Sequence, residues 1–414
     1  MPKAAETRQH LTRSLTLTHA VLYGLGVTIG AGIYVLVGIA AGRSGMHAPL
    51  AFLLAAVVMG FSAASFAELG TRMPVSASEA AYVEAAFRRK WLSLGVGLLV
   101  IVTATISGAT ISAGSAGYIG VFVPMSGRWI IVCVVLAMGL VACLATVQSV
   151  TFAGIMTLIE VGGLVLIVVA GLSVQASDIV TRIPEILPVM GDATAWISIA
   201  GTSLIAVFAF IGFEHLVNIA EELKDPRRTL PRALFLTLGL TAIFYGAVVW
   251  VAVTAVPHEE LARSPAPLAL VFQRLTGLPL VTMSMIAIVA TLNGIIVHMI
   301  MIARVIYGIA DQGNLPHALT SLNPVTGTPL MATAIGVGGI LILAVTVPLA
   351  GLADLAAQGT LLIFVIVNLA LIQIKRREKT LPANIFGCPQ WVPYVGLTSS
   401  LLLLILEFLA GRAV

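Results

Sequence analysis

Charged residues are scarce in this sequence. Lys, Arg, Asp and Glu together make up 10% of its 414 residues, whereas they make up about 25% of an ordinary soluble domain. The hydrophobic fraction is 59%, and the mean hydropathy is +1.06. Because so little charge cannot cover the surface of a water-soluble protein, the composition predicts an integral membrane protein.

Cysteine and histidine are also few, and their placement excludes several kinds of site. The three cysteines and seven histidines show neither the spacing of a metal site nor that of a nucleophile paired with a base. We therefore expect no enzyme, no cofactor and no bound metal. Cys133, Cys143 and Cys388 are interpreted as packing residues, because free cysteine behaves as a small hydrophobic side chain.

Long apolar runs dominate the chain. About 20 residues at 1.5 Å rise cross the hydrocarbon of a bilayer as a helix, and the short alternating segments of an outer-membrane barrel are absent from the sequence. The fold class predicted is an all-α membrane protein. Hydropathy predicts about eleven transmembrane helices, near residues 17–42, 49–70, 93–121, 128–147, 150–173, 196–222, 231–256, 279–310, 329–349, 354–374 and 392–410.

Positive charge is distributed unevenly between the two sides of these spans. No cleavable signal pattern precedes the first span, so we expect that helix to be the first crossing. With the N-terminus inside, 16 of the 22 basic residues lie on the inner side and 6 on the outer side. This predicts a cytoplasmic N-terminus, an extracytoplasmic C-terminus and a location in the inner (cytoplasmic) membrane of a bacterium. The bias needs no nucleic acid to explain it, since anionic lipid headgroups attract the same residues.

Two of the predicted helices contain glycines where a helix should continue. Residues 26–34 read GVTIGAGIY in the first span, and residues 208–222 read FAFIGFEHLVNIAEE in the sixth. Interrupted helices at corresponding positions of two halves indicate a transport site at the midplane. Small residues that only let helices pack closely are the alternative.

A break in a membrane helix frees backbone groups that a zwitterionic ligand can satisfy. The carboxylate of an amino acid can accept hydrogen bonds from freed N–H groups of the first break, and its ammonium can donate to freed carbonyls of the second. Glycine permits this close approach because it has no Cβ. The predicted substrate-binding residues are Thr28, Ile29, Gly30, Ala31, Gly32, Phe208, Ala209, Phe210, Gly212 and Phe213.

Polar side chains at membrane depth are candidates for ion coupling or gating. Glu160 lies near the middle of the fifth span, where a carboxyl is costly unless it is paired, hydrated or protonated. It is either a protonation switch or a permanently protonated carboxyl that bonds to a neighbouring helix. Glu214, Asn218, Asn293 and His298 are the other candidates, although a polar residue satisfied between helices is the alternative for each.

Two loops have helical character of their own. Residues 258–275 form an outer loop with a short helical pattern, which we interpret as a possible lid. Residues 79–90 are amphipathic and inner, and they lie either on the membrane surface or on the bundle.

Several segments together resemble a known family. GLGVTIGAGIYVLVG, MPVSASEAAYVE, FAFIGFEHLVNIAEELKDPRRTLPRAL and ATLNGIIVHMIMIARVIYGIADQGNLPHAL occur in the order typical of the amino acid–polyamine–organocation superfamily. The resemblance implies a leucine-transporter-like 5+5 inverted repeat, alternating access and an amino acid substrate. The chain departs from that pattern by having eleven spans rather than twelve, and by placing Glu160 where many proton-coupled relatives have lysine.

The predicted function is therefore secondary active transport of an amino acid, with H⁺ as the expected coupling ion. An ion-independent exchanger of amino acids or polyamines is the alternative, and a transporter-like nutrient sensor is a further one. The expected organisation is a cytoplasmic N-terminus (1–16), a first five-helix repeat (17–174), an extracytoplasmic loop (175–195), a second repeat (196–374), a cytoplasmic loop (375–391) and an additional helix (392–414).

Overall fold

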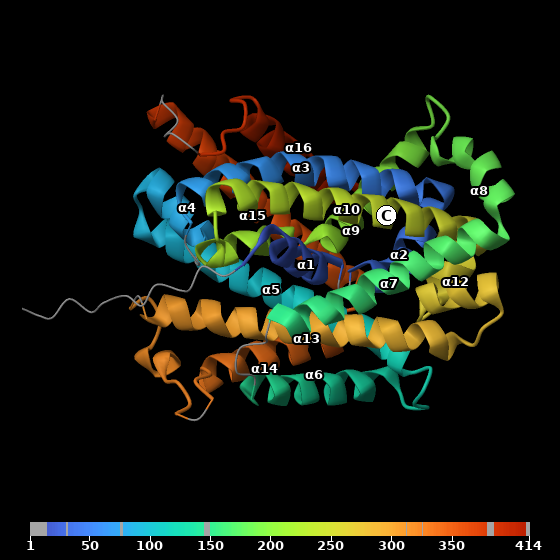
Figure 1. Cartoon of the computed structure of the whole chain (residues 1–414), viewed down its shortest axis with the longest axis horizontal. Coiled ribbons are helices and arrows are strands. Elements are labelled where there is room, and N and C mark those ends of the chain that lie inside the picture. The colour runs from blue at the N-terminus through green and yellow to red at the C-terminus, as the bar shows by residue number, and fades with distance from the viewer. Residues whose placement is uncertain are drawn as a thin grey trace, which may run out of the picture.

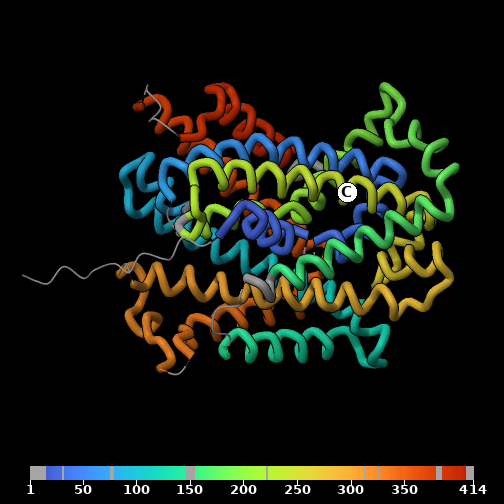
Figure 2. Tube along the Cα trace, in the orientation of Figure 1, coloured from blue at the N-terminus to red at the C-terminus, as the bar shows by residue number. Residues whose placement is uncertain are grey.

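The computed structural model is a bundle of helices, most of which run along one long axis (Figures 1 and 2). It describes residues 15–29, 32–74, 78–144, 150–311, 313–324, 326–378 and 385–410. Within these ranges the chain forms no β-strand, and one isolated bridge pairs Leu15 with Leu223. The predicted all-α fold class is confirmed.

The chain forms twenty helical elements in the described residues. Those of the first part are α1 Leu17–Ile29, α2 Gly32–Ser44, η1 Gly45–His47, α3 Ala48–Arg72, α4 Ser78–Phe87, α5 Lys90–Ile119, α6 Gly127–Leu144, α7 Val150–Val174, α8 Ala176–Thr181 and η2 Ile183–Ile186. Those of the second part are α9 Ala193–Phe210, η3 Phe213–Glu222, α10 Pro226–Ala255, α11 His258–Arg263, α12 Pro267–Thr276, α13 Leu280–Asp311, η4 His317–Thr320, α14 Leu330–Thr346, α15 Leu349–Arg377 and α16 Val392–Ala410.

These helices account for the predicted membrane crossings. Eight segments of the described chain are long and apolar enough to span a membrane, and α1, α14 and α16 contribute three shorter apolar helices. Helix occupies each of the eleven predicted windows, so the predicted set of spans is confirmed. Two helices begin five residues before their predicted windows: α10 at Pro226 rather than at residue 231, and α15 at Leu349 rather than at residue 354. Pro348 precedes α15, and because proline has no N–H to donate, a helix readily restarts directly after it.

The first and sixth windows each contain two helical elements. In the first, α1 Leu17–Ile29 and α2 Gly32–Ser44 lie on either side of Gly30 and Ala31, which are outside the described residues, so the predicted break there stays a prediction. In the sixth, α9 ends at Phe210, and Gly212 has a φ of 127°, a conformation that favours glycine. The chain then continues as the 3₁₀ helix η3.

The two predicted helical loops both lie against the bundle. Tyr82, Val83 and Ala86 of α4 are buried, and α4 packs on α5 and α15. Of the two interpretations of residues 79–90, the structure therefore favours packing on the bundle. In the outer loop, α11 and α12 confirm the helical pattern, and the carbonyl oxygen of Leu261 lies 2.6 Å from the position that a Cβ on Gly38 would occupy.

A buried charge cluster joins α3 to the segment that follows α15. The carboxylate of Glu68 is fully buried, and it accepts hydrogen bonds from Arg72, from Lys375 at 2.7 Å and from the backbone N–H of Cys388 at 2.9 Å. A buried charge needs such partners, because desolvation otherwise costs several kcal/mol. At the other end of the bundle, Arg43 of α2 pairs with Asp354 of α15 at 2.8 Å.

The cysteines differ in their surroundings. Cys388 is buried, and burial raises the pKa of its thiol to about 12, which keeps it protonated and unreactive. Cys143 is half-buried. The interpretation of Cys133 as a packing residue was wrong, because its side chain is exposed on α6. On a membrane helix, an exposed apolar position suits contact with lipid as well as with protein.

Candidate functional site

The residues on either side of the predicted first break lie in direct contact with the turn in the sixth window. A Cβ placed on Gly32 would stand 2.6 Å from Cα of Ala209, and one placed on Gly212 would stand 2.8 Å from the carbonyl oxygen of Val27. Each glycine therefore faces the backbone of the other interrupted helix, with no room for a side chain. Glycine at both positions allows the two interrupted segments to meet.

Tyr245 of α10 joins the end of α1 to the end of α9. Its hydroxyl oxygen lies 2.9 Å from the carbonyl oxygen of Thr28 and 2.9 Å from that of Ala209. These carbonyls lie in the last turns of α1 and α9, where the helix supplies no hydrogen-bond donor. The tyrosine O–H donates to this pair, and its ring packs against Phe210 and Phe52 at centroid distances of 5.1 and 5.9 Å.

The phenylalanines near the second break are all buried, but they face different neighbours. Phe210 packs on the Tyr245 side. Phe213 lies on the other side of the turn, with ring centroids 6.4 Å from Phe66 and 5.8 Å from Phe364. Phe208 is also buried. The turn at residues 211–212 is therefore enclosed by aromatic rings on two sides.

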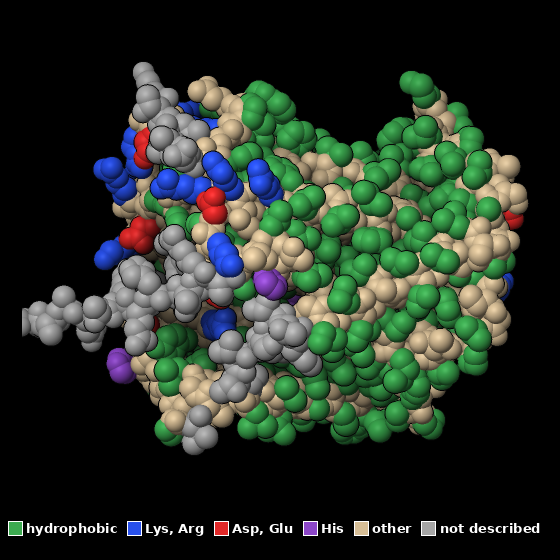
Figure 3. Space-filling view, viewed as in Figure 1, with side chains coloured by type: hydrophobic (Ala, Val, Ile, Leu, Met, Phe, Trp, Pro, Cys, Tyr) green, Lys and Arg blue, Asp and Glu red, His purple; other side chains and the backbone are tan. Residues whose placement is uncertain are grey.

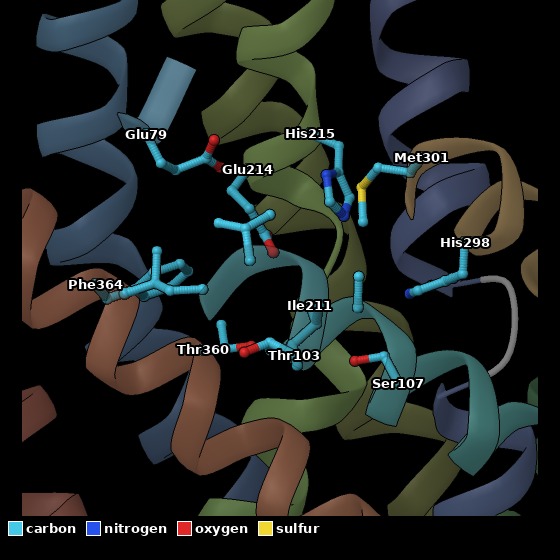
Figure 4. A pocket seen from close by; sticks show the side chains of 13 residues that line it. Glu79, Thr103, Ser107, Ile211, Glu214, His215, His298, Met301, Thr360 and Phe364 are labelled. Carbon is cyan, nitrogen blue, oxygen red and sulfur yellow. The ribbon is translucent and has the colours of Figure 1, made fainter. Parts of the chain in front are cut away.

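A small polar cavity adjoins this turn (Figure 4). About 30 Å³ of it admits the centre of a water molecule, which is room for roughly two waters. Figure 4 shows Glu79 and Phe364 on one side and Met301 and His298 on the other. The lining residues are Glu79, Val100, Thr103, Ala104, Ser107, Ile211, Glu214, His215, His298, Met301, Thr360, Ile363 and Phe364.

Part of the cavity's polar lining is held by hydrogen bonds. The carboxylate of Glu214 accepts a hydrogen bond of 2.8 Å from the backbone N–H of Gly212, which fixes the turn. Nδ1 of His298 lies 2.8 Å from the carbonyl oxygen of Gly294. Since a carbonyl can only accept, that nitrogen carries the proton. The rings of His215 and His298 meet edge to face with centroids 6.4 Å apart.

Other polar atoms of the lining have no partner. Among the described residues, the hydroxyls of Thr103 and Ser107 and Nδ1 of His215 are buried and make no hydrogen bond. Leaving a buried polar group unsatisfied costs about 1–3 kcal/mol. Groups of this kind around a cavity are suited to bond a ligand or water inside it.

Glu160 lies in a separate polar cluster. Its side chain is fully buried on α7, and one carboxylate oxygen accepts a hydrogen bond of 3.0 Å from the side-chain amide of Asn293 on α13. The hydroxyl of Tyr34 donates to the backbone carbonyl of Glu160 at 2.6 Å, and that of Tyr118 donates to the carbonyl of Tyr34. This chain of contacts links α7 to α13, α2 and α5.

The structure therefore divides the predicted site residues into three groups. The described residues near the two predicted breaks meet through Gly32 and Gly212, Glu160 meets Asn293, and Glu214 and His298 line the cavity. Ile29 is buried beside the first break, whereas Asn218 is half-buried further along η3 and does not line the cavity. Gly30 and Ala31 lie outside the described residues.

Sequence reasoning missed Tyr245 and the contribution of α5. Thr103 and Ser107 are four residues apart on that helix, so they share one face. Small polar residues at this spacing in an apolar helix are a signal that could have been used. Tyr245 follows Thr237 and Thr241 at four-residue spacing on α10, but no spacing in the sequence connects it to either predicted break.

Long apolar helices, with a buried turn inside the sixth window, define a helical membrane protein. Such irregular backbone at membrane depth is tolerated where it is buried in protein or lines a cavity. The chain matches the amino acid permease family over residues 15–413, and it belongs to that family.

Individual relatives carry more specific names. A branched-chain amino acid permease of Bacillus subtilis is 27% identical over 413 residues, covering 93% of this chain and 86% of that protein. An uncharacterized transporter of Mycobacterium tuberculosis is 29% identical, covering 91% of this chain and 85% of that protein. A vacuolar cationic amino acid transporter of Arabidopsis thaliana is 28% identical, covering 91% of this chain but 62% of that longer protein.

Proposed function

We propose that the protein is a secondary active amino acid transporter that works by alternating access. In this proposal the substrate binds where the first and sixth spans are interrupted, at the contact between Gly32, Ala209 and Gly212. The observation that carries the proposal is the end of α9 at a buried turn with a φ of 127° at Gly212. This turn lies beside a cavity with unpartnered polar side chains, and in the proposal it stands at membrane depth.

Alternating access is supported by the tightness of the site. The cavity holds about two waters, which is less than the volume of an amino acid, so the surrounding elements must separate before a substrate can enter. The Arg43–Asp354 pair and the Glu68 cluster each fasten α15 to an element of the first half at one end of the bundle. In the proposed cycle these contacts open in turn.

The halves on which this cycle depends are the two predicted five-helix repeats. The interrupted elements α1–α2 and α9–η3 would begin the two halves, which run in opposite directions through the membrane. Proton coupling would act through Glu160, which is buried and bonded to Asn293 of the second half. The relatives transport branched-chain or cationic amino acids by name, and either class is compatible with the mixed apolar and acidic cavity lining.

An ion-independent exchanger of amino acids or polyamines is the second candidate. It shares the site and differs only in coupling, so it predicts equal uptake with and without an ion gradient. A transporter-like nutrient sensor is a third candidate, and it predicts binding without transport.

The site itself is tested by removing the unpartnered hydroxyls of the cavity. We expect Thr103→Val combined with Ser107→Ala to weaken amino acid binding about thirtyfold, because two hydrogen bonds are lost and each contributes roughly 1 kcal/mol. The matched control is Thr202→Val with Ser284→Ala, whose hydroxyls are equally buried and unpartnered among the described residues but lie outside the cavity. Binding is measured by calorimetry in detergent. Equal affinity for the two double variants would contradict the proposed site.

A further inference from the structure

A wide groove opens at the start of α10, away from the transport site. It has a volume of about 890 Å³, far larger than the cavity beside the break. Its walls come from α10 and from the segment that precedes α16. The lining residues are Asp225, Arg227, Arg228, Pro231, Arg232, Phe235, Leu236, Ile385 and Phe386.

The groove is basic at one end and apolar at the other. Arg228 and Arg232 are one turn apart on the exposed face of α10, and Phe235 and Leu236, 40% and 46% exposed, continue that face by one more turn. Further along the same helix, Ile243 is 68% exposed. Charge followed by exposed apolar residues is the pattern of a helix that passes from the headgroup layer into hydrocarbon.

The charges of the groove are largely uncompensated. Three arginines line it against one acid, Asp225, which lies 3.9 Å from Arg228 in an exposed pair of little strength. In the described part of the chain, Arg227 and Arg232 form no ion pair. Figure 3 shows that Lys and Arg gather at this end of the molecule. Arginine presents a planar fork of donors that matches the geometry of a phosphate.

Aromatic contact closes the apolar end of the groove. The rings of Phe235 and Phe386 pack with centroids 5.8 Å apart. A wall of phenylalanine, leucine and isoleucine cannot bond a free anion, but it can hold an acyl chain whose phosphate lies among the arginines. The two ends of the groove thus suit the two parts of one amphipathic ligand.

We infer that this groove binds an anionic glycerophospholipid of the leaflet at the basic end of the bundle. The phosphate lies among Arg227, Arg228 and Arg232, and the first part of an acyl chain lies along Phe235, Leu236 and Phe386. The site is distinct from the proposed amino acid site, and a zwitterionic lipid fits it less well because its cationic group would meet the arginines.

The test uses the full-length protein, purified and stripped of lipid in detergent. Lipid binding is followed by native mass spectrometry and by melting temperature, with phosphatidylglycerol, phosphatidylcholine and inorganic phosphate as separate probes. We expect phosphatidylglycerol alone to bind at low ratios and to raise the melting temperature. Arg227→Gln with Arg232→Gln should weaken this binding about thirtyfold, the equivalent of about 2 kcal/mol, since each arginine near an anionic lipid contributes about 1 kcal/mol.

The matched control is Arg89→Gln with Lys90→Gln, which removes the same charge from exposed positions outside the groove. It should bind phosphatidylglycerol as the parent does. Three results would overturn the inference: equal binding of phosphatidylcholine, equal stabilisation by inorganic phosphate, or unchanged phosphatidylglycerol binding in the Arg227 and Arg232 double variant. Because all four substituted side chains are exposed, a single elution peak in size exclusion is expected for both double variants and confirms that they fold.

Discussion

Glu160 carries an ionisable carboxyl into the interior of the bundle, where Asn293 donates a hydrogen bond to one of its oxygens. Its second carboxylate oxygen is buried and has no hydrogen-bond partner among the described residues. A protonated carboxyl can donate from that oxygen, whereas an ionised one needs a counter-charge or water. The geometry therefore suits a group that changes its protonation state when its surroundings change.

We expect Glu160→Gln to retain amino acid exchange but to lose acceleration by an inward proton gradient. Glutamine resembles the protonated acid and still accepts the bond from Asn293, so the variant should fold. Uptake into proteoliposomes is measured with imposed H⁺ and Na⁺ gradients in turn. Glu185→Gln, at an exposed position of η2, is the control. Proton stimulation that survives in the Glu160 variant would exclude Glu160 as the coupling group. Uptake by the parent protein that depends on Na⁺ rather than on pH would instead indicate that Glu160 is a sodium ligand.

At the scale of elements, Gly212 is a glycine on which the contact between the turn after α9 and α1 depends. Gly212 has a φ of 127°, and a Cβ there would lie 2.8 Å from a carbonyl oxygen of the neighbouring helix. Backbone atoms of a packed helix cannot move aside as a flexible side chain can. Any larger residue at this position is therefore strained by its own conformation and by its neighbour.

We predict that Gly212→Ala lowers stability by more than about 1 kcal/mol, the usual minimum cost of such a strained conformation. Gly95→Ala is the matched control, because Gly95 lies inside α5 with open space around it, and alanine there is expected to be neutral or stabilising. Melting temperatures in detergent compare the two variants. An equal melting temperature for Gly212→Ala and Gly95→Ala would contradict the close contact between Gly212 and the backbone of α1.

The positions of the helices could be predicted from the sequence because bilayer thickness sets the length of every apolar run. The break near Gly212 could also be predicted, because a glycine followed closely by Glu214 is unexpected inside an apolar membrane helix. The spacing of Thr103 and Ser107 marks a polar face of α5 but does not place that face at the site, and Tyr245 could not be assigned at all, because these roles arise from the packing of α5 and α10 against other helices. Local pattern does not encode which helices become neighbours.

At the scale of the whole molecule, charge is concentrated at one end. Lys and Arg cluster where α4, the start of α10 and the end of α15 lie (Figure 3), and we propose that this end faces the cytoplasm. A reporter fused after Lys379 is then expected to be cytoplasmic, and one fused after Val414 extracytoplasmic, given eleven spans. A cytoplasmic reporter after Val414 would show that the number of crossings is even.

Uptake of labelled amino acids by the purified protein in proteoliposomes tests the central claim most directly. A panel that includes branched-chain and cationic amino acids is offered with and without an inward proton gradient, and protein-free liposomes are the control. We predict saturable uptake of a subset of the panel, accelerated by the gradient and competed by the unlabelled substrate. Specific binding without any uptake or exchange would contradict the assignment as a transporter.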